Sequence, residues 1–373
     1  MGLRFTSPAR SERTTAVLGI AVGALFGVCM LTGLLSHLIQ HPPGWFAWPS
    51  RPVWLYRWSQ GLHVFCGIAA VPALLAKLWS VYPNLYRWPP LRGVAHAIER
   101  AWIAPLVGGA LLLLVTGLMN IGYWYGWGFD FIKTHFWTAW IVTGALVVHL
   151  SAKLPVVRAA LARAQAPADI AGGLERRRFL ATTGLAAGVL LLVTAGSAFT
   201  PLRRLAVLSP RRQGVGPQRL PVNKDAASAG VGAKLLDPDW RLAVGGRVAR
   251  PASLSLVELQ ARMAGPMGHA ARLPIACVEG WSQEAHWRGV RLRGLLEEAG
   301  APADAAVRVQ SLQRGGYSTA LLNPAHARDP DTLLALELNG EPLHPDHGFP
   351  ARLIAPNNPG VMQTKWLESV TIL

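Results

Sequence analysis

The sequence predicts a membrane all-α bundle of four helices, then a fifth tethering helix, and finally a soluble α+β domain. Hydrophobic residues make up 51% of the 373 residues and charged residues only 15%. The first half contains five apolar segments, most of them near the roughly 20 residues that a helix needs to cross a bilayer. The second half instead shows short strand and helix patterns separated by turns. The apolar segments cover residues 16–38, 59–79, 102–121, 136–151 and 179–199.

The short elements of the second half are predicted individually. Alternating apolar residues predict strands at 240–244, 307–311, 353–355 and 369–373, with a turn at Gly245 and Gly246 after the first. Helical patterns predict short helices at 255–263 and 292–299. The fourth apolar segment of the first half is short, and we expect its helix to extend through His135 and Lys153.

Basic residues favour one orientation for the apolar segments. Residues 1–200 carry 16 Lys and Arg against 5 Asp and Glu, and residues 201–373 carry 20 against 15. With a cytoplasmic N-terminus, the outer loops hold only Arg51, Arg57 and Lys133, as the positive-inside rule requires. Five crossings then place the C-terminal domain on the extracytoplasmic side of a bacterial cell membrane. Arginines also follow the fifth segment, but long translocated domains largely escape the rule. Because the basic excess flanks apolar segments and no basic-aromatic motif is present, we expect no nucleic-acid partner.

Three arginines, Arg176 to Arg178, precede the fifth apolar segment. The pattern resembles a twin-arginine signal, an address read by a machinery that exports folded proteins. Folded export is needed when a cofactor is inserted in the cytoplasm. The alternative is an ordinary basic cluster at the cytoplasmic end of a transmembrane helix.

Histidines in the apolar half suggest haem ligation, because ionisable residues inside membrane spans are costly and usually functional. His135 and His149 lie 14 residues apart on one expected helix, a separation of about 21 Å and only about 40° around the axis. One axial ligand for each of two stacked b-type haems would have this spacing. Candidate partners are His63 and His37 at the outer level and His96 at the inner level. The alternative is that these histidines are interfacial or hydrogen-bonded.

This arrangement resembles the four-helix cytochrome b subunits of membrane formate dehydrogenases and hydrogenases, the formate dehydrogenase gamma-subunit type, over roughly residues 10–155. The resemblance implies haem b and exchange of electrons with quinone or quinol. Those relatives draw an inner haem ligand from the cytoplasmic end of the first helix, where this chain has no histidine. The number of haems is therefore one or two.

The densest motif surrounds Cys277, the only thiol of the soluble half, in the segment Leu-Pro-Ile-Ala-Cys-Val-Glu-Gly-Trp-Ser. No second set of Cys or His residues has the spacing for zinc or an iron–sulfur cluster. A thiolate here would therefore bind a metal carried by an organic cofactor. The alternative is a small buried apolar residue on a strand.

Cys-Val-Glu-x-Trp-Ser, with Trp-x-Gly downstream, resembles the molybdenum-ligating segment of the sulfite-oxidase fold. It is most similar to the periplasmic methionine sulfoxide reductase catalytic subunit. Residues 339–343, 347–352 and 365–367 resemble the ending of the same fold, so the resemblance covers most of residues 220–373. It implies that Cys277 is the thiolate ligand of molybdenum and that Arg352 pairs with the molybdopterin phosphate. It further implies cofactor contacts by His347, Gln363, Thr364, Lys365, Asn223, Lys224 and Ser311.

One departure from the sulfite oxidases concerns charge. Those enzymes cluster arginines around the metal to hold sulfite, whereas Cys277 is followed by Glu279, Glu284 and His286 before Arg288. A dianionic substrate would be held poorly, which disfavours sulfite.

The predicted fold class is thus a membrane all-α four-helix haem bundle with a fifth tethering helix, followed by a soluble α+β domain of the sulfite-oxidase molybdopterin fold. The predicted parts are a cytochrome b-like membrane domain at 1–155, a cytoplasmic linker with the twin-arginine-like motif at 156–178, the fifth transmembrane helix at 179–200, a linker and pterin-contacting lead segment at 201–236, and the molybdopterin-binding oxidoreductase domain at 237–373.

The predicted function is a molybdenum-dependent oxidoreductase that passes electrons between the quinone pool, haem b and a molybdenum centre. It would reduce an S-oxide such as oxidised methionine. The alternatives are an oxidase of sulfite or another small donor that feeds quinone, and a non-catalytic haem b electron-transfer protein. The expected partners are quinone or quinol, a small-molecule or protein S-oxide, the twin-arginine translocation machinery and the lipid membrane.

Overall fold

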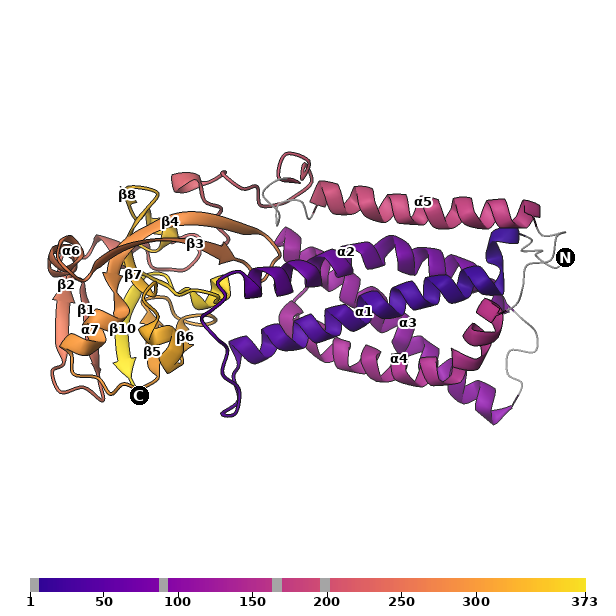
Figure 1. The fold of residues 1–373 in the computed structure, drawn as a ribbon, viewed down its shortest axis with the longest axis horizontal. Helices are drawn as coiled ribbons and strands as arrows, with labels where there is room; N and C mark the ends of the chain where they lie inside the picture. Colours follow the sequence, from indigo (N-terminus) through magenta and orange to yellow (C-terminus); the bar gives the residue numbers. More distant parts are fainter. Residues whose placement is uncertain (1–6, 87–92, 163–169, 195–201) are drawn as a thin grey trace. The chain divides into compact units, whose positions relative to one another are not determined.

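The computed structural model describes residues 7–86, 93–162, 170–194 and 202–373 (Figure 1). The chain divides into two compact units. The first contains Met1–Leu34, Leu62–Gly196 and Arg204–Pro210, and the second contains Leu35–Gly61, Ser197–Arg203 and Arg211–Leu373.

Five long helices account for the apolar half of the chain: α1 Glu12–Gln40, α2 Leu55–Val81, α3 Val94–Gly122, α4 Phe131–Ala162 and α5 Ile170–Thr194. All five are long and apolar enough to cross a membrane, as predicted. The fourth does extend through His135 and Lys153. The fifth already begins at Ile170, so Arg176 to Arg178 lie inside the helix and not ahead of it. Residues 195–199 of the fifth expected segment lie outside the described residues.

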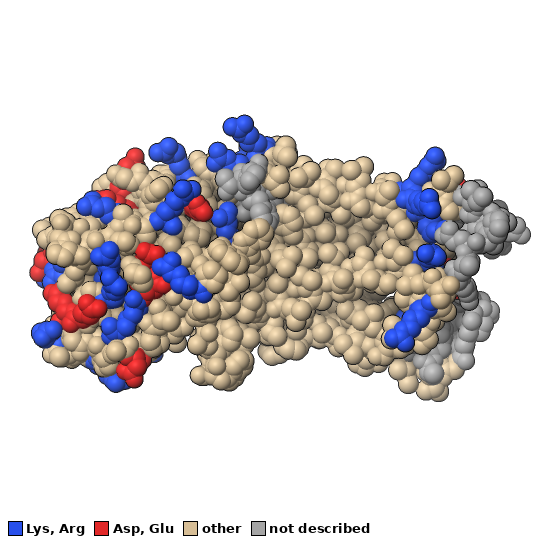
Figure 2. All heavy atoms as spheres, viewed as in Figure 1, with Lys and Arg blue, Asp and Glu red and all other residues tan. Residues whose placement is uncertain are grey.

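The helical unit exposes apolar side chains over most of its length. Leu31, Trp137, Val147 and Leu185 are among its exposed large hydrophobic residues. On the face shown in Figure 2, a broad surface carries no Lys, Arg, Asp or Glu, and the basic side chains gather at the end where α1 begins. Helices that are apolar all round suit either a large core or a lipid environment.

The second unit is built on two five-stranded sheets. The first has the order β2-β1-β10-β5-β6; the second has the order β3-β4-β7-β8, with β9 also paired to β7. Only the β1–β10 pair is parallel among the ladders of the described residues. The strands are β1 Arg241–Gly246, β2 Ala252–Ser255, β3 Gly268–Ala276, β4 Ser282–Arg291, β5 Val307–Ser311, β6 Thr319–Leu322, β7 Leu333–Leu338, β8 Glu341–Pro342, β9 Arg352–Ile354 and β10 Leu367–Ile372.

Three short helices, α6 Leu256–Ala264, α7 Leu292–Glu298 and α8 Pro324–Arg328, complete the α+β domain that the sequence predicted. The start of α6 shows why the local prediction worked. Ser255 caps the helix and forms a capping box with Glu258, a pattern that is readable from the sequence. The turn predicted at Gly245 and Gly246 is wrong, because β1 continues through both residues and pairs them with Thr371 and Ile372. Gly246 adopts a positive φ of 90°, and a Cβ there would meet the Ile372 carbonyl.

The core of the second unit also includes residues from the end of α1, the start of α2 and the connection between them. Ile39 and Tyr56 belong to the same hydrophobic cluster as Leu242, Val309 and Leu353, and Phe46 and Trp48 pack against that cluster. A segment expected to join two membrane spans is therefore part of the β domain's packing.

Candidate functional site

The Cys277 thiol is positioned by the tight turn between β3 and β4. Cys277 N donates to Trp281 O at 2.9 Å, and Gly280 N donates to Cys277 O at 3.1 Å. Gly280 has a φ of 93°, a backbone conformation that favours glycine. The turn leaves Cys277 only 5% exposed, and Asn223 Nδ2 donates to its sulfur at 2.8 Å.

The surroundings of Cys277 keep its sulfur protonated in the free protein. Burial, assisted by the charge of Glu279, raises the pKa of the Cys277 thiol to about 12. The nearby cations Arg352 and Lys365 interact electrostatically with this sulfur and favour its anionic form. A metal ion that bound here would displace the proton, because only the thiolate is a strong ligand.

Glu279 lies two residues beyond Cys277 and is 7% exposed. Its Oε2 atom is buried and has no hydrogen-bond partner among the described residues. Burial raises the pKa of Glu279 to about 7, against the opposing effects of Arg211 and Asn223. Asn223 Oδ1 in turn accepts from Arg211 Nε at 3.0 Å and from Trp281 Nε1 at 3.1 Å. The sulfur is thus adjacent to a carboxyl group that titrates near neutrality.

Arg352 begins β9 and is a buried guanidinium, 4% exposed. Its donors reach main-chain oxygens, Gln363 O at 3.2 Å from Nε and His347 O at 3.3 Å from Nη1. Its side chain also lies over the Trp287 ring, 5.4 Å from the centroid. Arg352 forms no ion pair with a carboxylate among the described residues. Burial lowers its pKa to about 10.

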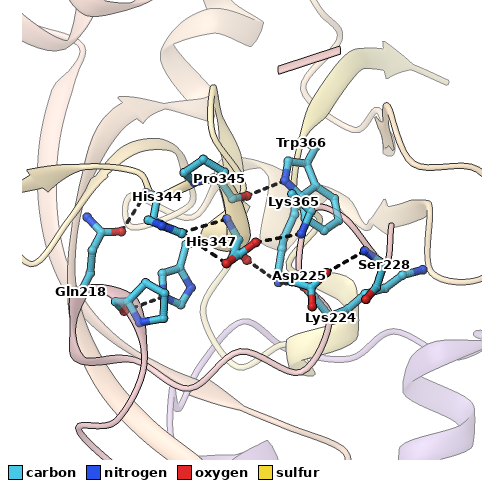
Figure 3. A network of polar contacts seen from close by, with 12 residues as sticks. Gln218, Lys224, Asp225, Ser228, His344, Pro345, His347, Lys365 and Trp366 are labelled. Atoms are coloured by element: carbon cyan, nitrogen blue, oxygen red, sulfur yellow. Dashed lines mark hydrogen bonds and ion pairs between the residues drawn. The ribbon is translucent and has the colours of Figure 1, made fainter. Parts of the chain in front are cut away.

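Lys365 is a second cation, partly buried, near the first. Its ammonium donates to the main-chain oxygens of Lys224 and Asp346, both at 2.7 Å, which joins the lead segment to the turn before β9 (Figure 3). Burial and the charge of Arg352 lower the pKa of Lys365 to about 7. Gly348, at a φ of 112°, lets the backbone pass close to Arg352 and Lys365, since a Cβ there would lie 3.2 and 3.1 Å from their Cβ atoms.

His347 completes this basic region as a neutral ring. Its Nε2 bonds Pro217 O at 2.8 Å (Figure 3), a carbonyl that can only accept, so Nε2 carries the proton. Burial, with the charges of Arg352 and Lys365, lowers the pKa of His347 to about 3. The imidazole therefore adds no positive charge at neutral pH.

Several buried polar atoms around these residues have no partner in the described part of the chain. Buried polar groups are normally hydrogen-bonded, and buried charges are normally paired. A buried guanidinium without an ion pair to a carboxylate in the described chain, a second cation beside it, and a group of unpaired donors and acceptors together fit an anionic, polar organic molecule. The unpaired atoms are Glu279 Oε2, Ser282 Oγ, Asn358 Nδ2, Gln363 Oε1 and Thr364 Oγ1.

Known proteins resemble the part of the chain that contains this site. Residues 230–373 match the family model of the oxidoreductase molybdopterin binding domain. An NAD(P)H nitrate reductase of Hordeum vulgare is 44% identical over 97 residues, which cover 23% of this chain and 11% of the relative. The uncharacterized oxidoreductase YuiH of Bacillus subtilis strain 168 is 33% identical over 132 residues, 35% of this chain and 64% of the relative. Sulfite oxidase of Arabidopsis thaliana is 36% identical over 104 residues, 24% of this chain and 26% of the relative.

Residues 230–373 are a molybdopterin-binding oxidoreductase domain of the sulfite oxidase and nitrate reductase type. The chain spans between 11% and 64% of the length of these relatives. The residues present fit the cofactor: Cys277 offers sulfur to molybdenum, and Arg352, with Lys365 beside it, offers positive charge to a phosphate.

The molybdopterin domain brings together most of the site residues predicted from the sequence. Bonds or electrostatic contacts link Asn223, Arg352 and Lys365 to Cys277. The side chains of His347, Gln363 and Thr364 are buried. Arg352 donates to the main-chain oxygens of His347 and Gln363, and Thr364 follows Gln363 in the chain.

Two predicted contacts have another structural role in the described chain. Ser311 Oγ donates to Lys365 O at 2.8 Å, so this hydroxyl supports the closing turn. Lys224 contributes its main-chain oxygen to Lys365. Sequence reasoning did not assign Arg211, Ser282 or Asn358 to the site. Ser282 ends the Cys-Val-Glu-Gly-Trp-Ser motif and could have been found there, whereas Arg211 has no local signal.

In the helical unit, His63 of α2 and His135 of α4 face each other, with ring centroids 6.3 Å apart. His63 Nδ1 lies 3.0 Å from Cys29 O, an acceptor, which places the ring proton on Nδ1. His135 Nδ1 lies 2.9 Å from Thr116 Oγ1, whose own proton is donated to Leu112 O at 2.7 Å. Both Nε2 lone pairs are therefore left available, with no hydrogen bond to either atom among the described residues.

Glycines lie beside both rings. A Cβ at Gly33 would come within 3.1 Å of the His63 ring, and a Cβ at Gly117 within 3.5 Å of the His135 ring. The other candidate histidines belong to α1, α3 and α4. His37 stacks on His41, with centroids 4.7 Å apart. His149 lies further along α4. His96 lies on α3, but its side chain is outside the described residues.

Proposed function

We propose that this protein is a membrane-anchored molybdopterin oxidoreductase that passes electrons between the quinone pool, haem b and a molybdenum centre, and that it reduces an S-oxide such as oxidised methionine. The observation that carries the proposal is the buried Cys277 sulfur beside Lys365 and beside Arg352, a buried cation that forms no ion pair with a carboxylate among the described residues. When bound, molybdopterin supplies two-electron oxygen-atom transfer at the metal.

The chain's own residues hold the cofactor and manage protons. Cys277 donates a thiolate whose charge is stabilised by Arg352 and Lys365. The guanidinium of Arg352, kept apart from carboxylates, suits bidentate binding of a phosphate. Neutral His347 orients its ring through Pro217 O and leaves the local positive charge to its neighbours.

S-oxide reduction consumes protons as well as electrons: an S-oxide, two electrons and two protons give a thioether and water. Glu279 is placed to deliver a proton, because its unpaired Oε2 is buried near Cys277 and its pKa is raised to about 7. General acids work best when their pKa lies near the operating pH. A neutral S-oxide also carries no charge for this carboxyl group to repel.

The membrane half supports the haem part of the proposal. The centroids of the His63 and His135 rings lie 6.3 Å apart, so two imidazoles from different helices could hold one metal ion between them. Both rings offer Nε2, and Gly33 and Gly117 leave room beside them. His63 and His135 would hold the iron of one haem b; His37, His96 and His149 remain candidates for a second.

The proposed location is a bacterial cell membrane, with the C-terminal domain on the extracytoplasmic side. The connection between α1 and α2 follows one crossing and packs into the β domain. This packing supports placing the connection and the β domain on the same side of a membrane. If α1 to α4 each cross once, the β domain reaches that side only if α5 crosses as well. Export of the folded domain by the twin-arginine machinery, through Arg176 to Arg178, is part of the proposal.

Two measurements test the function. Metal, pterin and optical analysis of the purified protein should find molybdenum, pterin and b-type haem together. Anaerobic assays with a quinol analogue should then reduce dimethyl sulfoxide or methionine sulfoxide. Protein with haem but without molybdenum would instead favour a non-catalytic electron-transfer role.

A second candidate function is oxidation of sulfite or another small donor, with electrons passed to quinone. The similarity to the sulfite oxidase of Arabidopsis thaliana favours it. Turnover with sulfite and an oxidant, and none with an S-oxide and a quinol, would select this direction.

A further inference from the structure

The connection between α1 and α2, together with the first residues of α2, holds one of the loops around the candidate molybdenum site. Asn357, one residue before the unpaired Asn358, is bonded to this connection on three atoms. Trp48 Nε1 donates to Asn357 O at 2.8 Å, Asn357 Nδ2 donates to Pro49 O at 2.7 Å, and Tyr56 N donates to Asn357 Oδ1 at 2.7 Å. Asn357 has a φ of 57°, a conformation in which few residues are stable without such support.

The first turns of α2 also hold the loop that carries the thiol. Gln60 Nε2 donates to Val278 O at 2.6 Å, one residue after Cys277. The two loops are themselves joined, since Ala276 and Pro359 form a parallel β-bridge. Residues 48–60 therefore span both sides of the site: Trp48 and Tyr56 hold the Asn357 loop, and Gln60 holds the Cys277 turn. We call residues 48–60 the clamp.

The clamp is anchored to the domain beyond the site. Arg51 forms a two-pronged ion pair with Asp329, with Nε to Oδ2 at 3.0 Å and Nη2 to Oδ1 at 2.9 Å. Asn323 Nδ2 donates to Trp48 O at 2.8 Å. An Arg–carboxylate pair with two parallel bonds fixes geometry more strongly than a single contact does. The clamp is thus bonded to the domain near its first residues, through Trp48 and Arg51, and at its last residue, through Gln60.

Tyr56 is a buried residue of the clamp. It is 1% exposed and belongs to the same core cluster as Ala276 and Met362. Its hydroxyl lies 3.1 Å from Ser36 Oγ and interacts electrostatically with Cys277. A buried hydroxyl with a fixed partner holds one orientation.

We propose that the clamp sets the catalytic geometry of the molybdenum site, with Trp48, Tyr56 and Gln60 as positioning residues for Cys277 and Asn358. This inference rests on the proposed function. On this proposal the clamp, which lies between two helices of the apolar half, is a structural part of the oxidoreductase domain. The site is then complete only in the full chain. Displacement of a reacting group by about 1 Å can lower a rate by about 100-fold.

The test uses full-length protein with Trp48→Phe and Gln60→Leu, singly and combined. Each change keeps most of the volume of the side chain and removes the group that donates the hydrogen bond. The matched control is Trp45→Phe, which lies in the same connection but is 77% exposed. Turnover of dimethyl sulfoxide is driven by reduced viologen, which bypasses the haem, and is normalised to molybdenum content. A second readout, independent of turnover, is the electron paramagnetic resonance spectrum of the molybdenum centre.

We expect kcat of the double variant to fall about 10-fold to 100-fold and its molybdenum spectrum to change, while Trp45→Phe matches the wild type in both. Tyr56→Phe, which removes only the hydroxyl, should alter the spectrum in the same direction. A double variant with wild-type kcat and an unchanged spectrum would overturn the clamp and leave the proposed function intact. A wild-type protein without molybdenum would overturn both. If the double variant loses its metal, the test is made with the single variants that retain full molybdenum content. An unchanged kcat in both single variants would then refute the proposal.

Discussion

The change Glu279→Gln tests the proton supply of the molybdenum site. Glutamine keeps the size and hydrogen-bonding capacity of the protonated carboxyl group but has no proton to give. We expect the wild-type rate of S-oxide reduction to fall as pH rises through about 7, where Glu279 loses its proton. The variant should lose about 100-fold or more in rate, in the range usual for general acids, and should show no transition near that pH.

The size of the effect on stability follows from the same pKa. A shift from 4.5 to about 7 corresponds to a cost of about 3 kcal/mol for carrying the charge in the folded protein. The stability that neutral Glu279 provides is fully present below the unfolded pKa of 4.5 and is lost as pH rises through about 7. Glu279→Gln should therefore be more stable than the wild type at pH 8, with little difference near pH 4.5.

The assay is a pH profile of kcat from 5.5 to 8.5, with reduced viologen as donor and dimethyl sulfoxide as acceptor, alongside melting temperatures at the same pH values. Glu284→Gln provides the control, because this carboxylate lies near the start of β4, five residues after Glu279, but has a side chain that is 42% exposed and pairs with Arg272. The reasoning fails if Glu279→Gln keeps the wild-type transition near pH 7, or if Glu284→Gln removes it.

Four other changes test the remaining parts of the proposal. Cys277→Ser should abolish turnover and leave haem absorbance intact; retained activity would exclude thiolate ligation. Arg352→Lys should lower pterin content several-fold, because one ammonium cannot replace a two-pronged contact with phosphate; an unchanged pterin-to-protein ratio would contradict this. His135→Ala should remove haem from its site, as measured by the haem-to-protein ratio, and an unchanged ratio would refute the pairing. Replacing Arg177 and Arg178 by Lys should leave the C-terminal domain inside the cell, so protease added outside should no longer cleave it.

Much of the fold could be predicted from local sequence. The five long helices follow from apolar runs of sufficient length, and α6 follows from its Ser255–Glu258 capping box. The strand β5 was predicted with the bounds that the structure shows, Val307–Ser311. The turn at Gly245 and Gly246 was not, because the pairing of β1 with β10, more than 100 residues away, overrides the local preference of glycine.

The candidate site likewise combines residues that the sequence predicts with contacts that depend on the fold. The sequence by itself determined the thiol, the arginine and the two histidines that face each other, because Cys277 and Arg352 lie in recognisable motifs and His135 lies in an apolar span. Only the tertiary structure decided that Arg352 is buried with no ion pair to a carboxylate among the described residues, and that Trp48 and Tyr56, some 300 residues away in the chain, hold Asn357. The physical reason is that hydrophobic periodicity and motifs report neighbours along one element, whereas charge pairing and burial depend on which distant segments the fold brings together.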